Sequence, residues 1–332
     1  MRGIFKRVLI ISIIGMCVFF YALSYGETAG GQVTFDSAQS LTIRFTNSFG
    51  LRMSPLSVNK TLHFSELFYT DDKGIKIKYH PISTDWIGPL MVRATGEEVT
   101  RDDEAPRFTG GFHGSDGDER GEATSKTVGM SITVDGKSYE TFELKKKVAF
   151  ETISIVLVKH TNAYNTAVAP VVEETVSYEI SADGTVKVAV KLTALSDLVI
   201  EKYYGLQSRT LKSTTIIKME GLDHKAKSYF ESPKARAWGM DVFGKYWIEV
   251  ALEDTGLGDF NYCIGKPQAF NLSYGKTYFN LINGRECVLG KGESVEWSGR
   301  YSFKGPYRVD EPVKLESGGN RDENPIVRNE AK

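Results

Sequence analysis

The chain has 332 residues, of which 25% are charged, 41% are apolar and 11% are aromatic. These values are typical of a globular protein and exclude a largely disordered chain, a collagen-like repeat and a coiled coil. The formal net charge is −1, from 41 basic and 42 acidic residues. No basic excess is present to hold a nucleic-acid backbone, so no nucleic-acid partner is expected.

The first residues have the pattern of an export signal. Three basic side chains lie among the first seven residues, before an apolar run over 8–23, and the small residues Ala22 and Ser24 have the spacing that a signal peptidase reads. The run is short for a membrane span, which needs about 20 apolar residues. We therefore expect residues 1–24 to be a signal peptide or an N-terminal membrane anchor, and this segment to be the only contact with a membrane. The rest of the chain would lie outside the cytoplasm, as a secreted, periplasmic or surface-anchored protein.

Two cysteines remain after such a leader, and the net charge becomes −4. An exported protein can oxidise Cys263 and Cys287 to a disulfide. Each cysteine also lies in a strand-like segment, where a buried free thiol is the alternative. Both states stay open at this stage, and the sequence does not indicate an oligomeric state.

Alternation with period two is the main signal in the body of the chain. It is clearest over residues 151–158, 172–180, 186–192 and 295–303. Each range predicts a strand with one face toward a core and the other toward water. No segment has a helical stripe of three turns, so we expect an all-β fold, in which antiparallel sheets pack as a sandwich over residues 30–305.

Three dipeptides predict tight turns between strands. They are Asp135-Gly136, Asp183-Gly184 and Asn283-Gly284. Glycine accepts the positive φ that a two-residue hairpin turn needs.

Two segments depart from the strand pattern. Residues 306–332 are polar and form an expected flexible tail. Residues 94–128 form a long glycine-rich stretch, in which nine acids and three arginines between Gly96 and Glu122 give a net charge of −6. A loop of this length within a compact domain is usually functional or disordered.

This loop holds the first candidate site, in the run Phe108-Thr109-Gly110-Gly111-Phe112-His113-Gly114. The glycines let the backbone approach a ligand closely and leave His113 few neighbours. A histidine there can transfer protons near neutral pH, with Phe112 as a substrate contact. The alternative is a glycine-rich turn whose histidine packs on a neighbouring strand.

Acids in the same loop suggest a metal. Asp116 and Asp118 lie two residues apart, and Ca²⁺ takes several oxygens from closely spaced acids. Their spacing is shorter than a recognised calcium loop, and a solvated acidic turn is the alternative. No cofactor other than Ca²⁺ is expected.

The second candidate follows the strand predicted to end near Val158. His160 and Asn162 point to the same side if the strand continues, and polar groups at a strand end commonly line a cleft. The alternative is a turn whose asparagines cap the backbone.

The third candidate is a strand with paired tyrosines. Tyr203 and Tyr204 face opposite ways, so one should be buried and one should reach a groove. An aromatic face beside Gln207 and Arg209 suits a sugar, because the ring covers C–H groups while the polar side chains bind hydroxyls. Ordinary strand aromatics are the alternative.

Residues 172–186 and 203–206 resemble the central hairpin of galactose-mutarotase-like β-supersandwich proteins, and residues 289–303 resemble the final strand of that fold. The resemblance implies an antiparallel β-supersandwich and a carbohydrate partner. Because that fold includes sugar epimerases, polysaccharide lyases and non-catalytic sugar-binding domains, it does not imply one reaction. A mutarotase has a histidine where Tyr203 or Tyr204 stands and a glutamate base near its C-terminus, where this chain has Glu293 in a turn. This difference argues against an epimerase.

The expected function is therefore that of an exported protein that binds or acts on a poly- or oligosaccharide. Lyases of the resembled fold use tyrosine or histidine for proton transfer, and asparagine, histidine or arginine to neutralise a uronate. By this resemblance, Tyr204 or His113 would remove the C5 proton, with His160 as a further catalytic group. Asn162 or Arg209 would stabilise the charge that develops. A non-catalytic sugar-binding module and a structural surface protein are the alternatives, and the sequence leaves open whether the chain is an enzyme.

Overall fold

In a computed structural model, residues 30–35, 40–56, 58–71, 75–81, 85–96, 99–100, 104–139, 147–166, 169–258 and 260–305 are described. Within these ranges the chain forms strands joined by turns, and no helix of a length and apolarity suited to crossing a membrane is present. The predicted leader at 1–24 and the predicted tail at 306–332 lie outside the described residues. The described residues from Gly31 onward belong to one compact unit.

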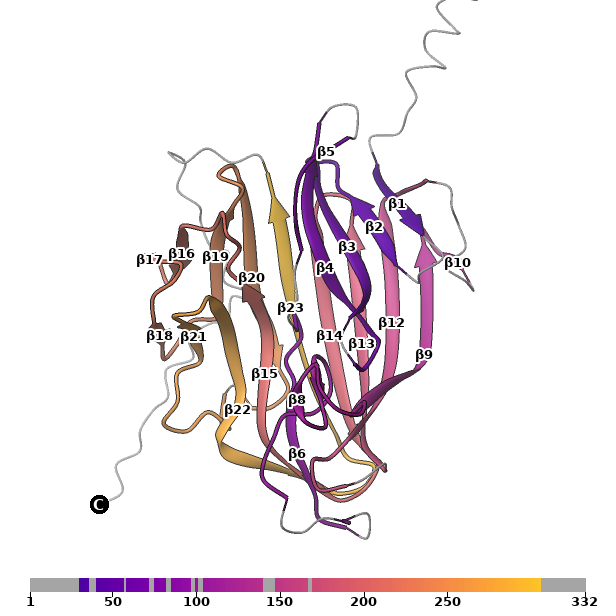
Figure 1. Cartoon of the computed structure of the whole chain (residues 1–332), viewed down its shortest axis with the longest axis vertical. Helices are drawn as coiled ribbons and strands as arrows, with labels where there is room; N and C mark the ends of the chain where they lie inside the picture. The colour runs from indigo at the N-terminus through magenta and orange to yellow at the C-terminus, as the bar shows by residue number, and fades with distance from the viewer. Residues whose placement is uncertain are drawn as a thin grey trace, which may run out of the picture. The chain divides into compact units, whose positions relative to one another are not determined.

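A ten-stranded antiparallel sheet forms the centre of this unit (Figure 1). In spatial order its strands are β10 (Lys137–Tyr139), β9 (Ser125–Val134), β12 (Thr152–Asn162), β13 (Pro170–Ser181), β14 (Thr185–Ala194), β23 (Ser294–Lys304), β20 (Tyr246–Thr255), β19 (Ala237–Val242), β16 (Ile216–Met219) and β17 (Leu222–Lys225). The four ranges with the clearest alternation all lie here, in β12, β13, β14 and β23. Their apolar positions face the core as predicted, for example Ile153, Val176, Val188 and Tyr301.

Three smaller sheets complete the described structure. The six-stranded sheet has the order β11 (Val148–Phe150), β1 (Gly31–Phe35), β2 (Leu41–Arg44), β3 (Phe49–Leu56), β4 (Thr61–Thr70) and β5 (Lys76–Pro81). The five-stranded sheet has the order β18 (Phe230–Ser232), β21 (Ala269–Leu272), β22 (Lys276–Leu289), β15 (Leu198–Arg209) and β6 (Leu90–Ala94). A small pair is formed by β7 (His113–Gly114) and β8 (Gly117–Asp118).

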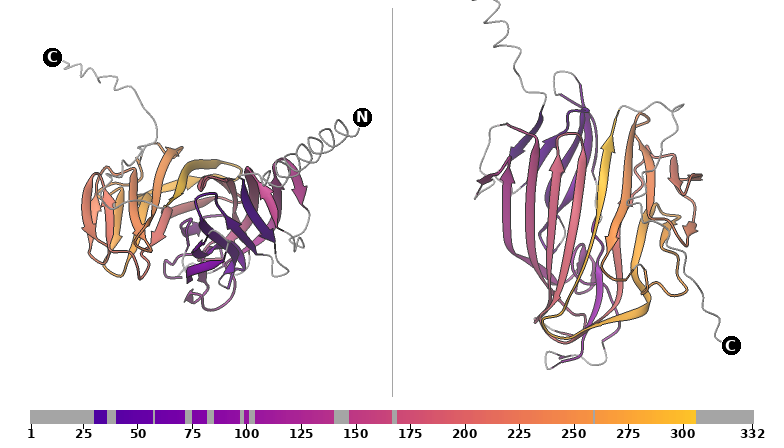
Figure 2. Two further views of the ribbon diagram at one scale, coloured as in Figure 1. Left: turned by 90° about the horizontal axis from the view of Figure 1, so that it is seen from above. Right: turned by 180° about the vertical axis from the view of Figure 1, so that it is seen from behind.

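The six- and five-stranded sheets pack on the same face of the ten-stranded sheet. On β23, Trp297 and Tyr301 are four residues apart and so point to one face. Tyr301 meets Phe64 of β4 at a ring-centroid distance of 5.4 Å, and Trp297 meets Tyr203 of β15 at 6.0 Å. Figure 2 shows the same arrangement from above and from behind. The predicted all-β sandwich of large antiparallel sheets is therefore confirmed.

Two of the three predicted hairpin turns are present. Asp135 and Gly136, both with positive φ, join β9 to β10, and Gly184, with φ of 99°, lies between β13 and β14. The third prediction is wrong, because Asn283 and Gly284 lie inside β22. The register shifts there, and Gly284 lies so close to a loop that a Cβ would sit 2.2 Å from the carbonyl oxygen of Ile264. The glycine is needed for this close approach and not for a turn.

Both cysteines of the described chain are free thiols, so the disulfide alternative is not what the structure shows. Cys287 is buried, and the thiol of Cys263 lies 3.1 Å from the carbonyl oxygen of Asn280. Burial raises the pKa of Cys263 to about 12, which makes it an inert thiol at neutral pH.

The hydroxyl of Tyr301 connects the central sheet to two other segments. It accepts a hydrogen bond from the backbone N–H of Gln207 at 3.2 Å and donates to the backbone carbonyl oxygens of Gln207 and Trp86. We expect Tyr301→Phe to lower the free energy of unfolding by about 1–3 kcal/mol, because it removes the buried hydrogen bonds that the hydroxyl makes to Gln207 and Trp86. Chemical denaturation measures this change. Tyr229→Phe is the control, since the Tyr229 side chain is exposed and bonds only to Glu231 on the surface; an equal loss in both variants would contradict the assignment.

Candidate functional site

The loop over residues 108–124, here called the His113 loop, is fixed by one buried asparagine. The Asn59 amide nitrogen donates to the carbonyl oxygens of Gly111 at 2.8 Å and His113 at 2.9 Å. Its oxygen accepts from the backbone N–H groups of Thr124 at 2.8 Å and Ser125 at 3.0 Å. Asn59 is only 3% exposed, so these four bonds are shielded from water. The loop is an ordered element beside β6, to which it is joined by backbone hydrogen bonds between Leu90 and Thr109 (Figure 1).

The His113 side chain is largely buried, contrary to the expectation that the flanking glycines leave it few neighbours. Its side chain is 14% exposed, and its ring lies 5.4 Å from that of Phe108. Nδ1 lies 2.8 Å from Oδ1 of Asp118, and Nε2 lies 3.6 Å from Oδ2 of Asp85. Burial lowers the pKa of His113, while the charge of Asp118 raises it. A neutral ring that donates Nδ1–H to Asp118 keeps a lone pair on Nε2, on the side of Asp85.

Asp85 is a fully buried carboxyl group beside this histidine. Burial raises its pKa to about 7, against the opposing charge of Lys276. A Cβ at Gly111 would lie 2.2 Å from Asp85 Oδ1, so only glycine permits this approach. Among the described residues, neither carboxyl oxygen has a hydrogen bond of ordinary geometry. A buried acid that titrates near neutral pH next to an imidazole is a typical acid–base pair.

An aromatic row extends from the histidine along the five-stranded sheet. Phe108 lies between His113 and Tyr204, with ring centroids 5.4 Å from each. Tyr204 then contacts Tyr278 at 4.9 Å, and Tyr278 stacks on Phe270 at 5.0 Å. A single ring thus separates the imidazole of residue 113 from the phenol of residue 204, which the sequence prediction required to share one site.

Tyr204 stays a neutral phenol at physiological pH. Burial raises its pKa to about 12. Beyond the row, Tyr274 is 65% exposed, and its hydroxyl lies 3.3 Å from that of Tyr278. The row therefore runs from a buried end at His113, past the half-buried Tyr204, to an open end at Tyr274.

The register of β15 and β22 explains why these side chains share a face. The pairs on this face are Tyr204 with Asn280, Gln207 with Tyr278, and Arg209 with Lys276. Tyr203 points to the other face, where it is fully buried and accepts a hydrogen bond from Trp297 Nε1 at 3.0 Å. The prediction that the two tyrosines face opposite ways is confirmed, and Tyr203 belongs to the core and not to a ligand-contacting surface.

Gln207 and Arg209 differ in their access to the site. Arg209 is exposed at the end of β15. Gln207 is fully buried, and within the described structure neither atom of its side-chain amide has a hydrogen-bond partner. Its backbone N–H donates to the carbonyl of Trp86 at 3.0 Å, which places it next to the segment that carries Asp85.

The structure does not bring His160 and Asn162 to His113. Strand alternation on β12 places them on the outer face of the ten-stranded sheet, where His160 Nε2 lies 3.2 Å from Glu173 Oε2. The intervening Thr161 faces inward and touches the loop, since a Cβ at Gly110 would lie 3.3 Å from its methyl group.

Asp116, Asp118 and Phe112 have other partners in the loop. Asp118 faces His113, and Asp116 Oδ1 accepts a hydrogen bond from Ser115 at 2.9 Å. The Phe112 carbonyl accepts from the backbone N–H of Glu119 at 2.9 Å, and its side chain is half-buried. In the part of the chain that the structure describes, no group of three or more histidines, cysteines or acids is placed to hold a metal ion, and a calcium site at Asp116 and Asp118 stays a prediction.

Four residues of this site were given no role in the sequence-based prediction. They are Asp85, Phe108, Lys276 and Tyr278. Phe108 belongs to the quoted loop motif. Lys276 and Tyr278 lie two residues apart at the start of a strand, a spacing that places both side chains on one face. Asp85 precedes a tryptophan in an irregular segment, and no local pattern marks it.

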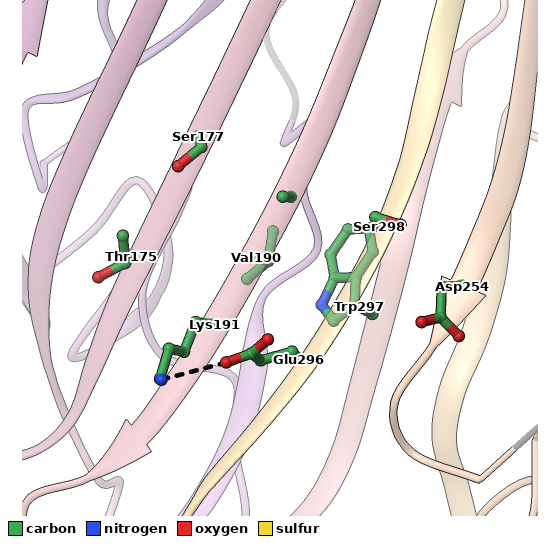
Figure 3. Close-up of a pocket in the computed structure, with 9 residues that line it drawn as sticks. Thr175, Ser177, Val190, Lys191, Asp254, Glu296, Trp297 and Ser298 are labelled. Carbon is green, nitrogen blue, oxygen red and sulfur yellow. Dashed lines mark ion pairs between the residues drawn. The ribbon is translucent and has the colours of Figure 1, made fainter.

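A second hollow lies on the outer face of the ten-stranded sheet (Figure 3). It is a shallow groove of about 330 Å³, where short side chains lie in register across three strands. These are Ser177, Ala189 and Ser298. The charged pair that borders it, Lys191 and Glu296 at 3.1 Å, is solvent-exposed. With neither an exposed aromatic face nor a perturbed acid–base pair among its lining residues, it is the weaker candidate.

Comparisons with known proteins give matches at the level of fold. No family model matches the chain, and no curated protein matches it. Among solved structures, an α-galactosidase from Geobacillus stearothermophilus matches 81% of this chain and 41% of its own at 7% identity, with a TM-score of 0.47. A galactose mutarotase related enzyme from Lactobacillus acidophilus matches 83% of this chain and 100% of its own at 9% identity, with a TM-score of 0.39. A heparan sulfate lyase from Pedobacter heparinus matches 85% of this chain and 36% of its own at 8% identity, with a TM-score of 0.31.

These structures include galactosidases and a galactose mutarotase related enzyme. The chain spans 40% to 42% of the length of the galactosidase chains that it matches.

Burial of Asp85 predicts a variant that is more stable than the natural protein. The folded state holds the Asp85 proton up to about pH 7, whereas the unfolded state releases it near 3.8. The contribution of Asp85 to the free energy of unfolding therefore falls as pH rises between these values and stays low above pH 7. We expect Asp85→Asn to raise this free energy by as much as about 4 kcal/mol near pH 8, with little effect near pH 4.

The matched control is another buried aspartate. Asp241 accepts backbone hydrogen bonds from Thr215 at 2.8 Å and Ile216 at 2.7 Å, so Asp241→Asn should destabilise the protein. Thermal unfolding at the two pH values measures both effects. Destabilisation of Asp85→Asn at pH 8 would show that the carboxylate has a structural role.

Proposed function

We propose that the site around His113 binds a carbohydrate and transfers protons on it. The observation that carries this proposal is the placement of the Asp85–His113 pair, 3.6 Å apart, at one end of the aromatic row. An acid–base pair serves chemistry, and a row of aromatic rings beside it serves binding of a ligand with apolar faces.

The row supplies the binding surface for a sugar. Phe108 is half-buried, and the row ends at the exposed Tyr274. The C–H face of a pyranose packs on such rings, while the phenol hydroxyls of Tyr204, Tyr274 and Tyr278 offer hydrogen bonds to its hydroxyls. Together they suit an oligosaccharide that extends from the buried end to the open end.

His113 is the proton acceptor in this proposal. Its lowered pKa keeps the ring neutral near pH 7, and Nε2 holds the available lone pair. When Nε2 takes a proton, the carboxylate of Asp118 at Nδ1 stabilises the imidazolium that forms. Tyr204, with its pKa raised to about 12, is suited to donate a proton and not to accept one.

For a uronate polymer these roles give a β-elimination. His113 takes the proton from C5, the C–H electron pair forms the C4–C5 double bond, and the C4–O bond breaks. The leaving oxygen takes its proton from Tyr204, and the cation of Arg209 stabilises the charge on the carboxyl group. Asn162 has no part in this proposal because its side chain lies on the other face of the sheet. Export through residues 1–24 completes the proposal, since such polymers lie outside the cytoplasm.

A non-catalytic sugar-binding module is the second candidate function. The exposed ring of Tyr274 favours it, because a row of aromatics that reaches solvent can bind a sugar without any proton transfer.

The lyase proposal predicts a loss of turnover that is specific to one histidine. We expect His113→Ala to lower the rate at which uronate polymers give an ultraviolet-absorbing unsaturated product by about 10²-fold or more. His160→Ala is the matched control, because His160 is paired with Glu173 on the outer face and should keep the rate of the natural protein.

The pH profile follows from the same histidine. Burial lowers the pKa of His113 below the ordinary value of 6.5. The rate of product formation should therefore stay constant as the pH falls to 6.5, and should decline only at lower pH, where the ring becomes protonated. If no uronate polymer gives product, but a sugar panel shows binding that Tyr204→Ala abolishes, the binding module is supported instead. If the panel shows no binding, both carbohydrate proposals fail.

A further inference from the structure

We infer that the His113 site selects a sugar that bears a negatively charged group, and that Lys276, with Arg209 beside it, is the cation that recognises this group. The inference rests on the proposed carbohydrate function and specifies its substrate class.

The first observation is the pairing of two cations. In the register of β15 and β22, Arg209 stands directly opposite Lys276. Both belong to the face that carries Tyr204 and Tyr278. Like charges that are directly opposite in a sheet destabilise it. An anionic group that both cations approach would relieve this repulsion.

The second observation is the setting of Lys276. It is half-buried, and its ammonium lies 5.4 Å from the ring centroid of Tyr278. Burial lowers the pKa of Lys276, and the charges of Asp85 and Asp118 oppose this effect. A cation in such a position interacts strongly with a ligand charge, because water screens it poorly.

A third cation lies at the other end of the aromatic contacts. The Lys202 ammonium is 5.9 Å from the ring centroid of Phe108. The tyrosines between the two lysines thus have positive charge on both sides. Residues 96–122, which include most of the His113 loop, have a net charge of −6, but the loop's acid nearest the site, Asp118, already pairs with His113.

The titratable groups that face Lys276 leave the site with a positive balance. Asp85, with a pKa of about 7, is roughly half protonated at neutral pH. Asp118 is 76% exposed and therefore well screened. The ammonium of Lys276 faces these two acids, and that of Lys202 lies at the other end of the row. A sugar with hydroxyl groups alone gives these cations no counter-charge, whereas a carboxylate or a sulfate ester accepts charge-assisted hydrogen bonds from them.

The experiment is a binding panel of neutral, uronate-bearing and sulfate-bearing oligosaccharides. Its best acidic binder is then titrated in its natural form and after chemical reduction of the carboxyl groups or removal of the sulfates, which distinguishes the two sources of charge. We expect acidic members to bind, and Lys276→Gln to weaken them by about tenfold or more without affecting neutral members. Arg209→Gln, at an exposed position, should give a smaller loss of the same kind.

Lys187→Gln is the matched control, because Lys187 is exposed on the outer face and paired with Glu179. It should leave binding unchanged. Binding confined to neutral sugars, or equal affinity of the natural protein and Lys276→Gln for acidic ones, would overturn the inference and leave the carbohydrate proposal standing. A panel without any binding would overturn the carbohydrate proposal and, with it, this inference.

Discussion

The candidate site depends on the contact between an irregular segment, residues 85–88, and strand β15. The Gly88 N–H donates to the carbonyl of Gly205 at 3.1 Å, and the Gln207 N–H donates to the carbonyl of Trp86 at 3.0 Å. A Cβ at Gly88 would lie 2.1 Å from the carbonyl oxygen of Tyr204, so the two backbones can meet only because this residue is glycine. The hydroxyl of Tyr301, on the central sheet, donates to the carbonyl oxygens of Trp86 and Gln207 in these two segments. These bonds hold the buried carboxyl group of Asp85 against His113.

This arrangement destabilises the charged form of Asp85. A carboxyl group that is buried without partners destabilises its charged form, and structures keep such groups where a function requires them. The surrounding parts are, in contrast, well satisfied: Asn59 makes four hydrogen bonds to the His113 loop and its neighbours. A firmly held loop around an unsatisfied acid is the combination expected of a site in which geometry is fixed and the proton remains mobile.

The sequence was sufficient for the fold because the large sheet is built from long strands with one buried face. The alternation in 172–180 and 186–192 is a direct consequence of that burial, and it also separates Tyr203 from Tyr204 correctly. It fails at Asn283-Gly284, where the carbonyl of Tyr262 accepts hydrogen bonds from Asn283 and Arg285, and a bulge forms instead of a turn. Asp-Gly and Asn-Gly both favour a tight turn, so the local sequence does not distinguish Asn283-Gly284 from the two turns that form.

The site could be predicted only in the parts that a local pattern marks. Glycines identify the surroundings of His113, and paired tyrosines identify Tyr204. Asp85 and Lys276 reach the site through strand pairings and backbone contacts between residues far apart in the sequence, and no spacing records these contacts. His160 is the opposite case. Its residue type is common in active sites, but strand alternation on β12 places its side chain on the outer face of the sheet.

The two aspartates beside the His113 imidazole differ in their exposure to water and therefore in their effect on the ring. Asp118 is exposed and lies 2.8 Å from Nδ1, where a charged carboxylate orients the ring and stabilises its protonated form. Asp85 is buried on the Nε2 side, where burial raises its pKa to about 7 and favours its protonated form. With the environments exchanged, a buried carboxyl group would lie at Nδ1 and a solvated carboxylate at Nε2. In the proposed mechanism, the present order keeps Nε2 of His113, the proton acceptor, in the dry part of the site and next to the aromatic row.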